Sequence, residues 1–564
     1  MRPIHRCHAL PALVVALTIG LPPDSAGGAP PQASRSATDD FNARAARVFH
    51  REYFFHRWNE SDHTVDGEDW SLPPGVRAAP YSGITAPKAA STDFPGRIQR
   101  SVKPTWRSVE LEEGRFDIAP LRAAILEASE QGRYSVRIGL AATVWETRYF
   151  RQLGDPTVAR VEVGSAPRWL TRYGIPIIEE RPNASTPFQV VNFDIYHPEY
   201  HRRYLRLVAE FGRSGIPQMK ELDQCYLHLR SASRGEEGKG PELTDPNRRL
   251  YEERLHAWAA AFQGVAFKLC NVSGGEDDIA LCNQLGMGQR NGFVEHYLLH
   301  APNAALGQEL DAEGYLVVNE QCPIIAENRA SGDENEEYQN EVRFGPLATF
   351  PHRYHESMLR ALQMRRNFLW AETGNWLVNP PLLHYVALEL GQTVRTAPDA
   401  WCYLRESRTR QHTVRNFERW LFQRDAEGAR AVPTEKVDVP EQMFEFHRSH
   451  LYDYTARRTD RANGQTMIRF AVDDAFLSGG PHRVAVKITY LDRDHTQWDL
   501  AFQASDQKRA VRSVTCGNTG KVRTVTFLLP DAVFPGRGYT GSDLQITATK
   551  GDAVIRLVRV IKLP

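Results

Sequence analysis

The sequence predicts an α/β fold, a (β/α)8 TIM barrel followed by a C-terminal antiparallel β-sandwich. Between residues 93 and 425, short apolar runs alternate with longer amphipathic runs, as they do when helices connect parallel strands. From residue 426 to 564, apolar and polar residues alternate within short runs that Gly, Asp and Asn turns separate. This second pattern is typical of an antiparallel sandwich. At 564 residues the chain is long enough for both parts.

Residues 1–29 are predicted to be a signal peptide. Arg2 and Arg6 precede an apolar run over 9–21, and prolines and small residues follow it. The run is too short to span a bilayer, so we expect a secreted or periplasmic protein with no integral membrane segment after signal removal. A membrane anchor at this end is the alternative. Residues 30–92 are interpreted as an N-terminal extension that leads into the barrel.

The composition excludes some partners and predicts no cofactor. Lys+Arg and Asp+Glu number 69 each, so the chain lacks the basic excess of a nucleic-acid-binding protein. Six of the seven cysteines follow the predicted signal, and an exported protein permits them to pair, although the sequence does not choose a pairing. No close Cys/His spacing indicates zinc, so no metal is expected. The oligomeric state stays open.

The predicted barrel elements follow one another along the chain. The strands are predicted at 97–109, 134–144, 222–229, 265–272 and 367–372, with shorter apolar runs at 315–318 and 323–327. The helices are predicted at 118–131, 198–213, 247–262, 352–366 and 381–390. Sandwich strands are predicted at 482–490, 521–528 and 553–561. Long polar loops follow several barrel strands, which fits a catalytic face at the carboxyl ends of the strands.

Two carboxylates follow predicted strands, as glycosidic hydrolysis requires. The first is Glu237, which follows the strand at 222–229 between Gly235 and Gly238; glycines allow the tight backbone path that aims a side chain into a cleft. Glu237 is the candidate acid/base, and a solvated acidic turn is the alternative. The second is Glu327, at the end of the apolar run 323–327, which is the candidate nucleophile.

Glu320 is the rival of Glu327, because it also ends an apolar run. The acidic stretch at 332–338 lacks the spacing of an EF-hand loop, and we interpret it as a loop that is solvated or binds substrate hydroxyls.

Aromatic and polar side chains gather near the same predicted strand ends. Flat rings bind the apolar C–H faces of sugars while polar neighbours bind the hydroxyls. The candidate substrate-binding residues are Trp106, Arg107, Trp145, Trp169, Arg230, Asn328, Tyr338 and Trp370. For any single tryptophan, packing in the core is the alternative.

Several motifs resemble those of clan A (β/α)8-barrel glycoside hydrolases, including the family 42 β-galactosidases and related bacterial barrels. The stretch 106–117 resembles their "W…LEPEEGKYDF" segment, and 165–170 resembles their "aP.Wl" loop. The resemblance extends over about residues 93–406. It implies a barrel fold and a carbohydrate substrate.

The same resemblance implies roles for the two glutamates. The string 234–238 is similar to the end of the fourth strand in such barrels, which implies that Glu237 is the acid/base. The run 323–327 is similar to the seventh-strand segment that carries the nucleophile, here Glu327. Clan A enzymes have Asn just before the acid/base, whereas Glu236 stands there in this chain, so Glu236 is an alternative to Glu237.

The expected function is a secreted glycoside hydrolase of the retaining type, with its two carboxyl groups about 5 to 5.5 Å apart. Its expected substrate is a poly- or oligosaccharide, either galactose-containing or acidic or sulfated. One alternative is a non-catalytic glycan-binding protein on a barrel scaffold, which the missing Asn favours. The other is a polysaccharide lyase, which removes a proton with a Tyr, His or Lys base.

Overall fold

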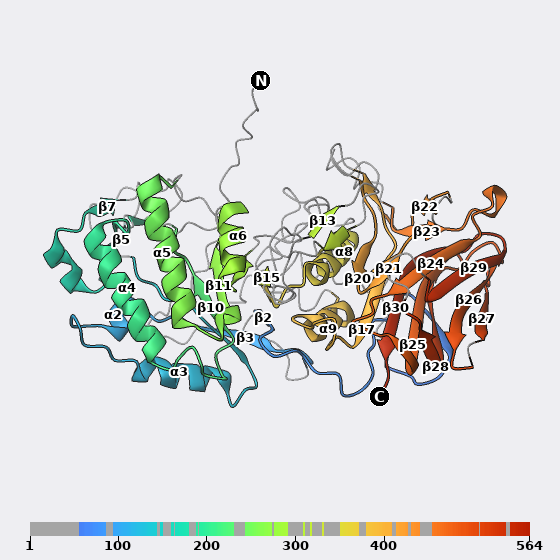
Figure 1. Cartoon of the computed structure of the whole chain (residues 1–564), viewed down its shortest axis with the longest axis horizontal. Helices are drawn as coiled ribbons and strands as arrows, with labels where there is room; N and C mark the ends of the chain where they lie inside the picture. The colour runs from blue at the N-terminus through green and yellow to red at the C-terminus, as the bar shows by residue number, and fades with distance from the viewer. Residues whose placement is uncertain are drawn as a thin grey trace, which may run out of the picture.

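The computed structural model has two connected parts, one built on a parallel sheet and one on an antiparallel sheet (Figure 1). The structure describes residues 56–85, 94–143, 147–150, 159–162, 164–179, 188–189, 191–230, 243–272, 276–290, 308–310, 316–318, 330–331, 350–370, 379–408, 413–426, 430–439, 454–506, 508–536 and 542–564.

The first part contains an eight-stranded parallel sheet. Its strands are β2 (Gly83–Thr85), β3 (Ile98–Val102), β4 (Ser135–Ile138), β10 (Gln224–Leu227), β11 (Leu269–Val272), β12 (Gly288–Arg290), β15 (Ala330–Ser331) and β16 (Phe368–Trp370). From β2 to β15 they are adjacent in chain order, and the last strand, β16, pairs with the first, β2. This is the strand order of a (β/α)8 barrel. The hydrogen-bonded path through the described strands has β15 and β16 at its two ends, so full closure of the barrel stays a prediction.

Helices connect most of these strands. They are α2 (Trp106–Val109), α3 (Ala119–Ser129), α4 (Pro198–Arg213), α5 (Asp245–Ala261), α6 (Glu276–Gln284), α8 (Phe350–Gln363) and α9 (Pro380–Glu389). The five predicted helices are confirmed to within a few residues at each end, whereas the sequence analysis omitted α6. Pro198 lies in the first turn of α4, where its missing N–H costs nothing, and the His197 side chain accepts a bond from the Glu199 backbone N–H.

Three predicted strands differ from the structure. In the one predicted at 265–272, Ala266–Lys268 form a 3-10 helix and β11 begins only at Leu269. The predicted strand at 97–109 divides into β3 and the short helix α2, because Thr105 and Ser108 form a capping box that begins the helix. The run at 315–318 forms β14 (Leu316–Val318), which pairs antiparallel with β13 (Gln308–Leu310) and not with the parallel sheet. The run at 323–327 lies outside the described residues, and the seventh parallel strand is β15.

The connection between β4 and α4 carries further small elements. They are β5 (Thr147–Phe150), β6 (Ala159–Glu162), the 3-10 helix η1 (Arg168–Tyr173), β7 (Ile177–Glu179), β8 (Phe188–Gln189) and β9 (Val191–Phe193). Their strands form a three-stranded and a two-stranded sheet apart from the main one.

The second part is a thirteen-stranded antiparallel sheet. Its strands are β1 (His63–Asp66), β17 (Asp399–Tyr403), β20 (Phe417–Arg419), β21 (Leu421–Gln423), β22 (Thr434–Glu435), β23 (Ala456–Arg458), β24 (Met467–Val472), β25 (Gly479–Leu491), β26 (Gln497–Ala504), β27 (Arg509–Thr515), β28 (Val522–Phe534), β29 (Leu544–Lys550) and β30 (Val554–Lys562). A separate hairpin joins β18 (Ser407–Arg408) to β19 (Thr413–Val414). Strands β25, β28 and β30 cover the three predicted sandwich strands, and their alternating buried residues form a large apolar core.

Strands on both sides of the predicted boundary at residue 426 belong to this sheet. Strand β17 pairs with β30, and β21 pairs with β24. Strand β1, from the predicted N-terminal extension, pairs with β28 in the antiparallel sheet. Strand β2, from the same extension, is the first strand of the parallel sheet.

Helices α8 and α9 lie between the two parts (Figure 1). One hydrophobic cluster contains Ile84 of β2, Leu369 of β16, Val386 of α9 and Trp401 of β17. Because a single cluster takes residues from both sheets, the two parts share a core and form a continuous packed unit.

Buried ion pairs cross the same interface. Glu68 lies 3.0 Å from Nε2 of His355 on α8 and 2.9 Å from Nε of Arg556 on β30. Burial raises the pKa of Glu68, but the two cationic partners outweigh burial, and the pKa lies below its ordinary value. These bonds tie the N-terminal segment to both parts at once.

Candidate active site

The inner face of the parallel sheet is recognised from the alternation of its side chains. Val136, Ile138, Cys225 and Leu227 of β4 and β10 are buried in the cluster that underlies the helices. Because successive side chains of a strand point to opposite faces, residues between them face the other way, toward the inside of the sheet. The inner face therefore carries polar side chains on both strands.

A chain of hydrogen bonds crosses this inner face. The Thr85 hydroxyl donates to Oε1 of Gln99 at 3.2 Å, and Nε2 of Gln99 donates to Oε1 of Gln224 at 3.0 Å. Gln99 lies on β3 and Gln224 on β10, and β4 separates these strands in the sheet. Side chains from non-adjacent strands meet only across a concave surface, so the sheet curves inward at this level.

Arg137 and Tyr226 lie on the same face, nearer the carboxyl ends of the strands. The Arg137 guanidinium carbon is 5.2 Å from the centre of the Tyr226 ring, and both side chains are half-buried. Ser101 of β3 pairs with Arg137 in the strand register. His228 follows β10 and is half-buried. A cation, a phenol and a hydroxyl in one concave face can bind a polar, oxygen-rich substrate.

The chain just beyond β10 is held rigidly. The Tyr196 hydroxyl donates to the Arg230 carbonyl at 2.5 Å, and burial raises the pKa of Tyr196, so it stays a donor at neutral pH. The buried Arg254 guanidinium donates to the Leu229 carbonyl at 3.0 Å and to the Ile195 carbonyl. The backbone is therefore fixed up to Arg230, directly before the segment that contains Glu236 and Glu237.

Arg230, a predicted substrate-binding residue, forms an ion pair with Asp278 of α6. The distance from Nη1 of Arg230 to Oδ2 of Asp278 is 2.8 Å. The Asp278 side chain is 2% exposed and the Arg230 side chain is 17% exposed. Arg248 of α5 lies 3.8 Å from the other carboxylate oxygen. This pairing fixes the guanidinium of Arg230 at the carboxyl end of the strand.

Trp106 and Trp169, also predicted to bind substrate, are buried. Trp106 has no exposed surface, and Trp169 is 4% exposed. Their rings pack edge to face with 5.8 Å between centroids. The structure places both rings in the core beneath the α helices, where neither presents an open face to a sugar.

The segments 106–117 and 165–170 contact one another. The Arg107 backbone N–H donates to the Ser165 carbonyl at 2.9 Å, and Nε1 of Trp169 donates to the Glu110 carbonyl at 3.3 Å. The side chain of Arg107 is half-buried, whereas Arg168 is exposed. These hydrogen bonds hold the two segments together after the carboxyl ends of β3 and β4.

Five predicted site residues lie outside the described residues: Trp145, Glu237, Glu327, Asn328 and Tyr338. Trp370 is the last residue of β16 and pairs with Thr85 of β2 in the register, at the carboxyl edge. The separation of the two candidate carboxylates therefore remains a prediction.

Sequence analysis missed several residues of the inner face, namely Gln99, Arg137, Gln224 and Tyr226, and the partner Asp278. A signal for Arg137 was present, because a charged residue between Val136 and Ile138 in an apolar strand is uncommon and indicates a lined interior. Asp278 lies on α6, a helix that the sequence analysis omitted, so its contact with Arg230 was beyond prediction.

Five cysteines are described, all five are buried, and no disulfide joins any two of them. Burial raises the pKa of Cys225, so it stays a thiol at neutral pH. Among the described residues, no group of three or more His, Cys, Asp and Glu side chains is placed to hold a metal ion. In that same part of the chain, no helix has the length and apolar character needed to cross a membrane.

No family model and no curated protein matches this chain. Several solved structures are similar over part of it. The catalytic domain of β-amylase from Paenibacillus polymyxa is 12% identical and has a TM-score of 0.30, over 56% of this chain and 99% of that one. A GH5_18 protein from Bifidobacterium longum subsp. longum, in complex with Manβ1-4GlcNAc, is 12% identical with a TM-score of 0.29, over 52% and 69%.

A family 39 glycoside hydrolase from Bacteroides cellulosilyticus WH2 is 10% identical with a TM-score of 0.27, over 88% of this chain and 83% of that one. At these TM-scores the likeness does not establish a shared fold and carries no argument about function.

Proposed function

We propose that this chain is an exported glycoside hydrolase that acts at the carboxyl edge of the parallel sheet. The observation that carries the proposal is the end of β10, the fourth strand, where a fixed backbone leads directly into the segment with Glu237. In barrel enzymes the catalytic residues come from the carboxyl ends of the strands. Glycosidic hydrolysis needs two carboxyl groups there, and we assign Glu237 as acid/base. The resemblance of 323–327 to a nucleophile segment makes Glu327 the proposed nucleophile.

The polar inner face supports an acidic sugar as the substrate. Arg137 presents a guanidinium beside the Tyr226 ring, and Arg230 holds a second one at the end of β10. A guanidinium binds a carboxylate or sulfate through two parallel hydrogen bonds, and an aromatic ring packs on the sugar face. We therefore propose a uronate-containing or sulfated glycan ahead of a neutral one.

The position of β15 adds rivals to Glu327. The chain enters β15 at Ala330, after Glu327, and leaves it at Ser331 on the carboxyl edge. The glutamates that follow the strand are Glu334, Glu336 and Glu337. Because catalytic residues follow barrel strands, these three belong in the same mutational test as Glu327 and Glu320.

The test is hydrolysis of a polysaccharide panel by the wild-type chain and by single Glu→Gln variants. We expect Glu237→Gln to lower kcat roughly a hundredfold or more, and azide to rescue it as a glycosyl azide. We expect the nucleophile variant to lose turnover, and NMR of the first product to show retention of the anomeric configuration. Full activity in both Glu236→Gln and Glu237→Gln would remove the acid/base assignment.

A second candidate, a polysaccharide lyase, is favoured by one contact. Arg137 lies beside Tyr226, the arrangement that neutralises a uronate carboxylate next to a phenolic base. The base would take the C5 proton, the C4–C5 double bond would form, and the C4–O bond would break with a proton passing to the leaving oxygen. Ultraviolet absorbance from the new double bond distinguishes this product from a hydrolysis product.

A further inference from the structure

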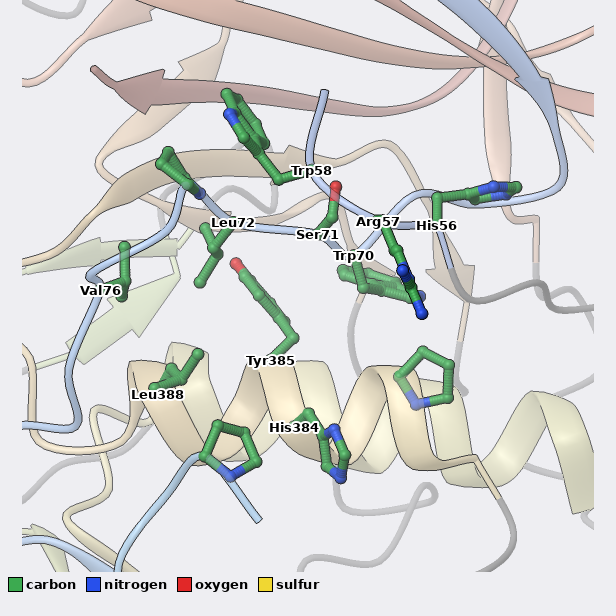
Figure 2. A pocket seen from close by; sticks show the side chains of 13 residues that line it. His56, Arg57, Trp58, Trp70, Ser71, Leu72, Val76, His384, Tyr385 and Leu388 are labelled. Carbon is green, nitrogen blue, oxygen red and sulfur yellow. The ribbon is translucent and has the colours of Figure 1, made fainter. Parts of the chain in front are cut away.

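A cavity of about 360 Å³ lies apart from the carboxyl edge, between the N-terminal segment and helix α9. Figure 2 shows Trp70, Ser71 and Leu72 of the N-terminal segment facing His384, Tyr385 and Leu388 of α9 across it. Leu382, Leu383 and Val386 of the same helix are in the cluster shared with the parallel sheet. The volume is at the small end of the range for ligand sites and fits a molecule with one or two rings.

Two fixed rings form the base of this cavity. The centroids of Trp70 and Tyr385 are 5.0 Å apart, and the Arg559 guanidinium lies 4.5 Å from the Tyr385 ring centre. The Tyr385 hydroxyl donates to Asp399, with both carboxylate oxygens at 3.1 Å, and Asp399 pairs with Arg559 at 2.7 Å. These bonds hold the rings in place before any ligand arrives, so a ligand orders little on binding.

The polar groups of the lining are largely engaged with the protein. The Ser71 hydroxyl donates to Asp69 at 2.6 Å and accepts from Lys487 at 3.0 Å. A ring nitrogen of His56 bonds the Asp66 carbonyl at 2.9 Å. A sugar would bring many hydroxyls to this cavity and leave them without partners, which is costly for a buried polar group. An apolar ring suits these walls better.

Arg57 is the exposed charged residue of the lining. It is exposed at the cavity, and over the described ranges from 56 to 564 no ion pair or hydrogen bond engages its guanidinium. The cavity lining contains no Asp or Glu. Burial lowers the pKa of His384, so this histidine is neutral at pH 7. Arg57 therefore brings a permanent positive charge to the cavity, and one guanidinium matches one carboxylate.

We propose that this cavity binds a small aromatic carboxylate, with its ring among Trp58, Trp70 and Leu388 and its carboxylate on Arg57. The site is independent of the proposed glycan hydrolysis. The alternative, an acidic sugar in the same cavity, is disfavoured because the Ser71 and Tyr385 hydroxyls and a His56 ring nitrogen already bond the protein, which leaves few partners for several sugar hydroxyls.

The test is isothermal titration of the exported chain with cinnamate. Its matched neutral probe is cinnamyl alcohol, and its sugar probe is glucuronate. Two variants address the cavity, Arg57→Gln at the exposed charge and Val76→Phe, which fills space at a half-buried lining residue. The matched control is Arg172→Gln, an exposed arginine of η1. Circular dichroism melting checks that each variant folds.

We expect cinnamate to bind more tightly than cinnamyl alcohol, and Arg57→Gln to weaken cinnamate binding about fivefold while leaving the alcohol unchanged. Val76→Phe should weaken both aromatic probes, and Arg172→Gln should change neither. Equal binding of the acid and the alcohol, tighter binding of glucuronate than of cinnamate, or no heat from cinnamate would each overturn the proposal. All of these measurements report binding and not catalysis. They therefore test this proposal even if the chain does not hydrolyse glycans.

Discussion

Nε1 of Trp106 donates to Oε2 of Glu110 at 2.7 Å, and neither residue has any exposed surface. The other oxygen of Glu110 accepts from the Gly114 backbone N–H at 2.7 Å and from Arg206 of α4. One buried carboxylate thus joins helix α2, the turn after it and helix α4. Such a carboxylate is costly to bury unless every partner is in place.

We predict that Glu110→Ala lowers the free energy of unfolding by about 2 to 4 kcal/mol, because it leaves the buried Trp106 donor and the Gly114 N–H without their acceptor, while Arg206 keeps Glu113. Urea denaturation measures the loss. The matched control is Glu112→Ala, an exposed glutamate whose replacement should change stability by less than about 0.5 kcal/mol. Equal stability of the two variants would show that the buried carboxylate contributes no net stability.

Asp278→Asn should impair catalysis more than folding. The substitution removes the charge that holds the Arg230 guanidinium, while the amide keeps the shape of the side chain. We expect KM to rise roughly tenfold, because Arg230 then no longer meets the substrate in a fixed position. Steady-state kinetics on the substrate found by the panel is the measurement. Asp277→Asn, at an exposed neighbour on the same helix, is the control and should leave KM unchanged.

In the cluster of His63, Asp69 and Lys487, the first two residues should make stability decline on both sides of neutral pH. Asp69 raises the pKa of His63 above 6.5, so this contribution is complete below pH 6.5 and is lost as pH rises through the folded pKa. Although burial opposes it, His63 and Lys487 lower the pKa of Asp69, so its contribution is present above pH 3.8 and is lost on further acidification.

Burial also lowers the pKa of Lys487 to about 8, below its ordinary value of 10.5, so Lys487 makes stability increase as pH rises above about 8 and opposes the alkaline decline from His63. The unfolding midpoint in urea, followed from acid to alkaline pH, tests the cluster. In His63→Gln, the loss of stability just above neutral pH should disappear, whereas the loss of stability at acidic pH that arises from Asp69 should remain. An unchanged profile in that variant would exclude His63 as the source.

Glu68→Ala should loosen the connection between the two parts of the molecule. It removes the acceptor that faces Nε2 of the buried His355 and one of the two carboxylates beside Arg556, which keeps Asp438, at a cost of about 1 to 3 kcal/mol. Limited proteolysis should then cut the N-terminal segment faster. Glu60→Ala, at an exposed glutamate, serves as the comparison and should be cut at the wild-type rate.

The sequence predicted helices and strands best where the spacing of apolar residues and the residue types at the ends of an element indicated the same structure. Helix α4 was predicted at its observed bounds, because Pro198 marks its start and its apolar residues repeat at helical spacing. The strands β25, β28 and β30 showed clear alternation. Helix start signals and the alternation of apolar residues involve only residues that are close together in the chain, so they can be recognised in the sequence alone.

Long-range contacts were much harder to anticipate. The residues around His63–Asp66 give no sign in the sequence that this strand pairs with β28, which lies near the other end of the chain. Likewise, Trp106 was predicted to lie at the end of a strand and to bind sugar. In the structure, Thr105 caps helix α2, which begins at Trp106, and the Trp106 ring is buried in the core. The candidate glutamates at 237 and 327 were chosen because they follow apolar runs and match motif positions, and both stay predictions.

The pairing of β1 with β28 also bears on how the protein matures. If the chain crosses a membrane N-terminus first, as the signal predicts, β1 emerges early and its hydrogen-bonding partner emerges almost last. Until Val522–Phe534 arrives, the early strand has an open edge that is able to pair with other chains. A chain cut short before β28 would keep the elements of the parallel sheet but lack this closing strand. Truncated chains of this kind should therefore aggregate more readily than the full chain.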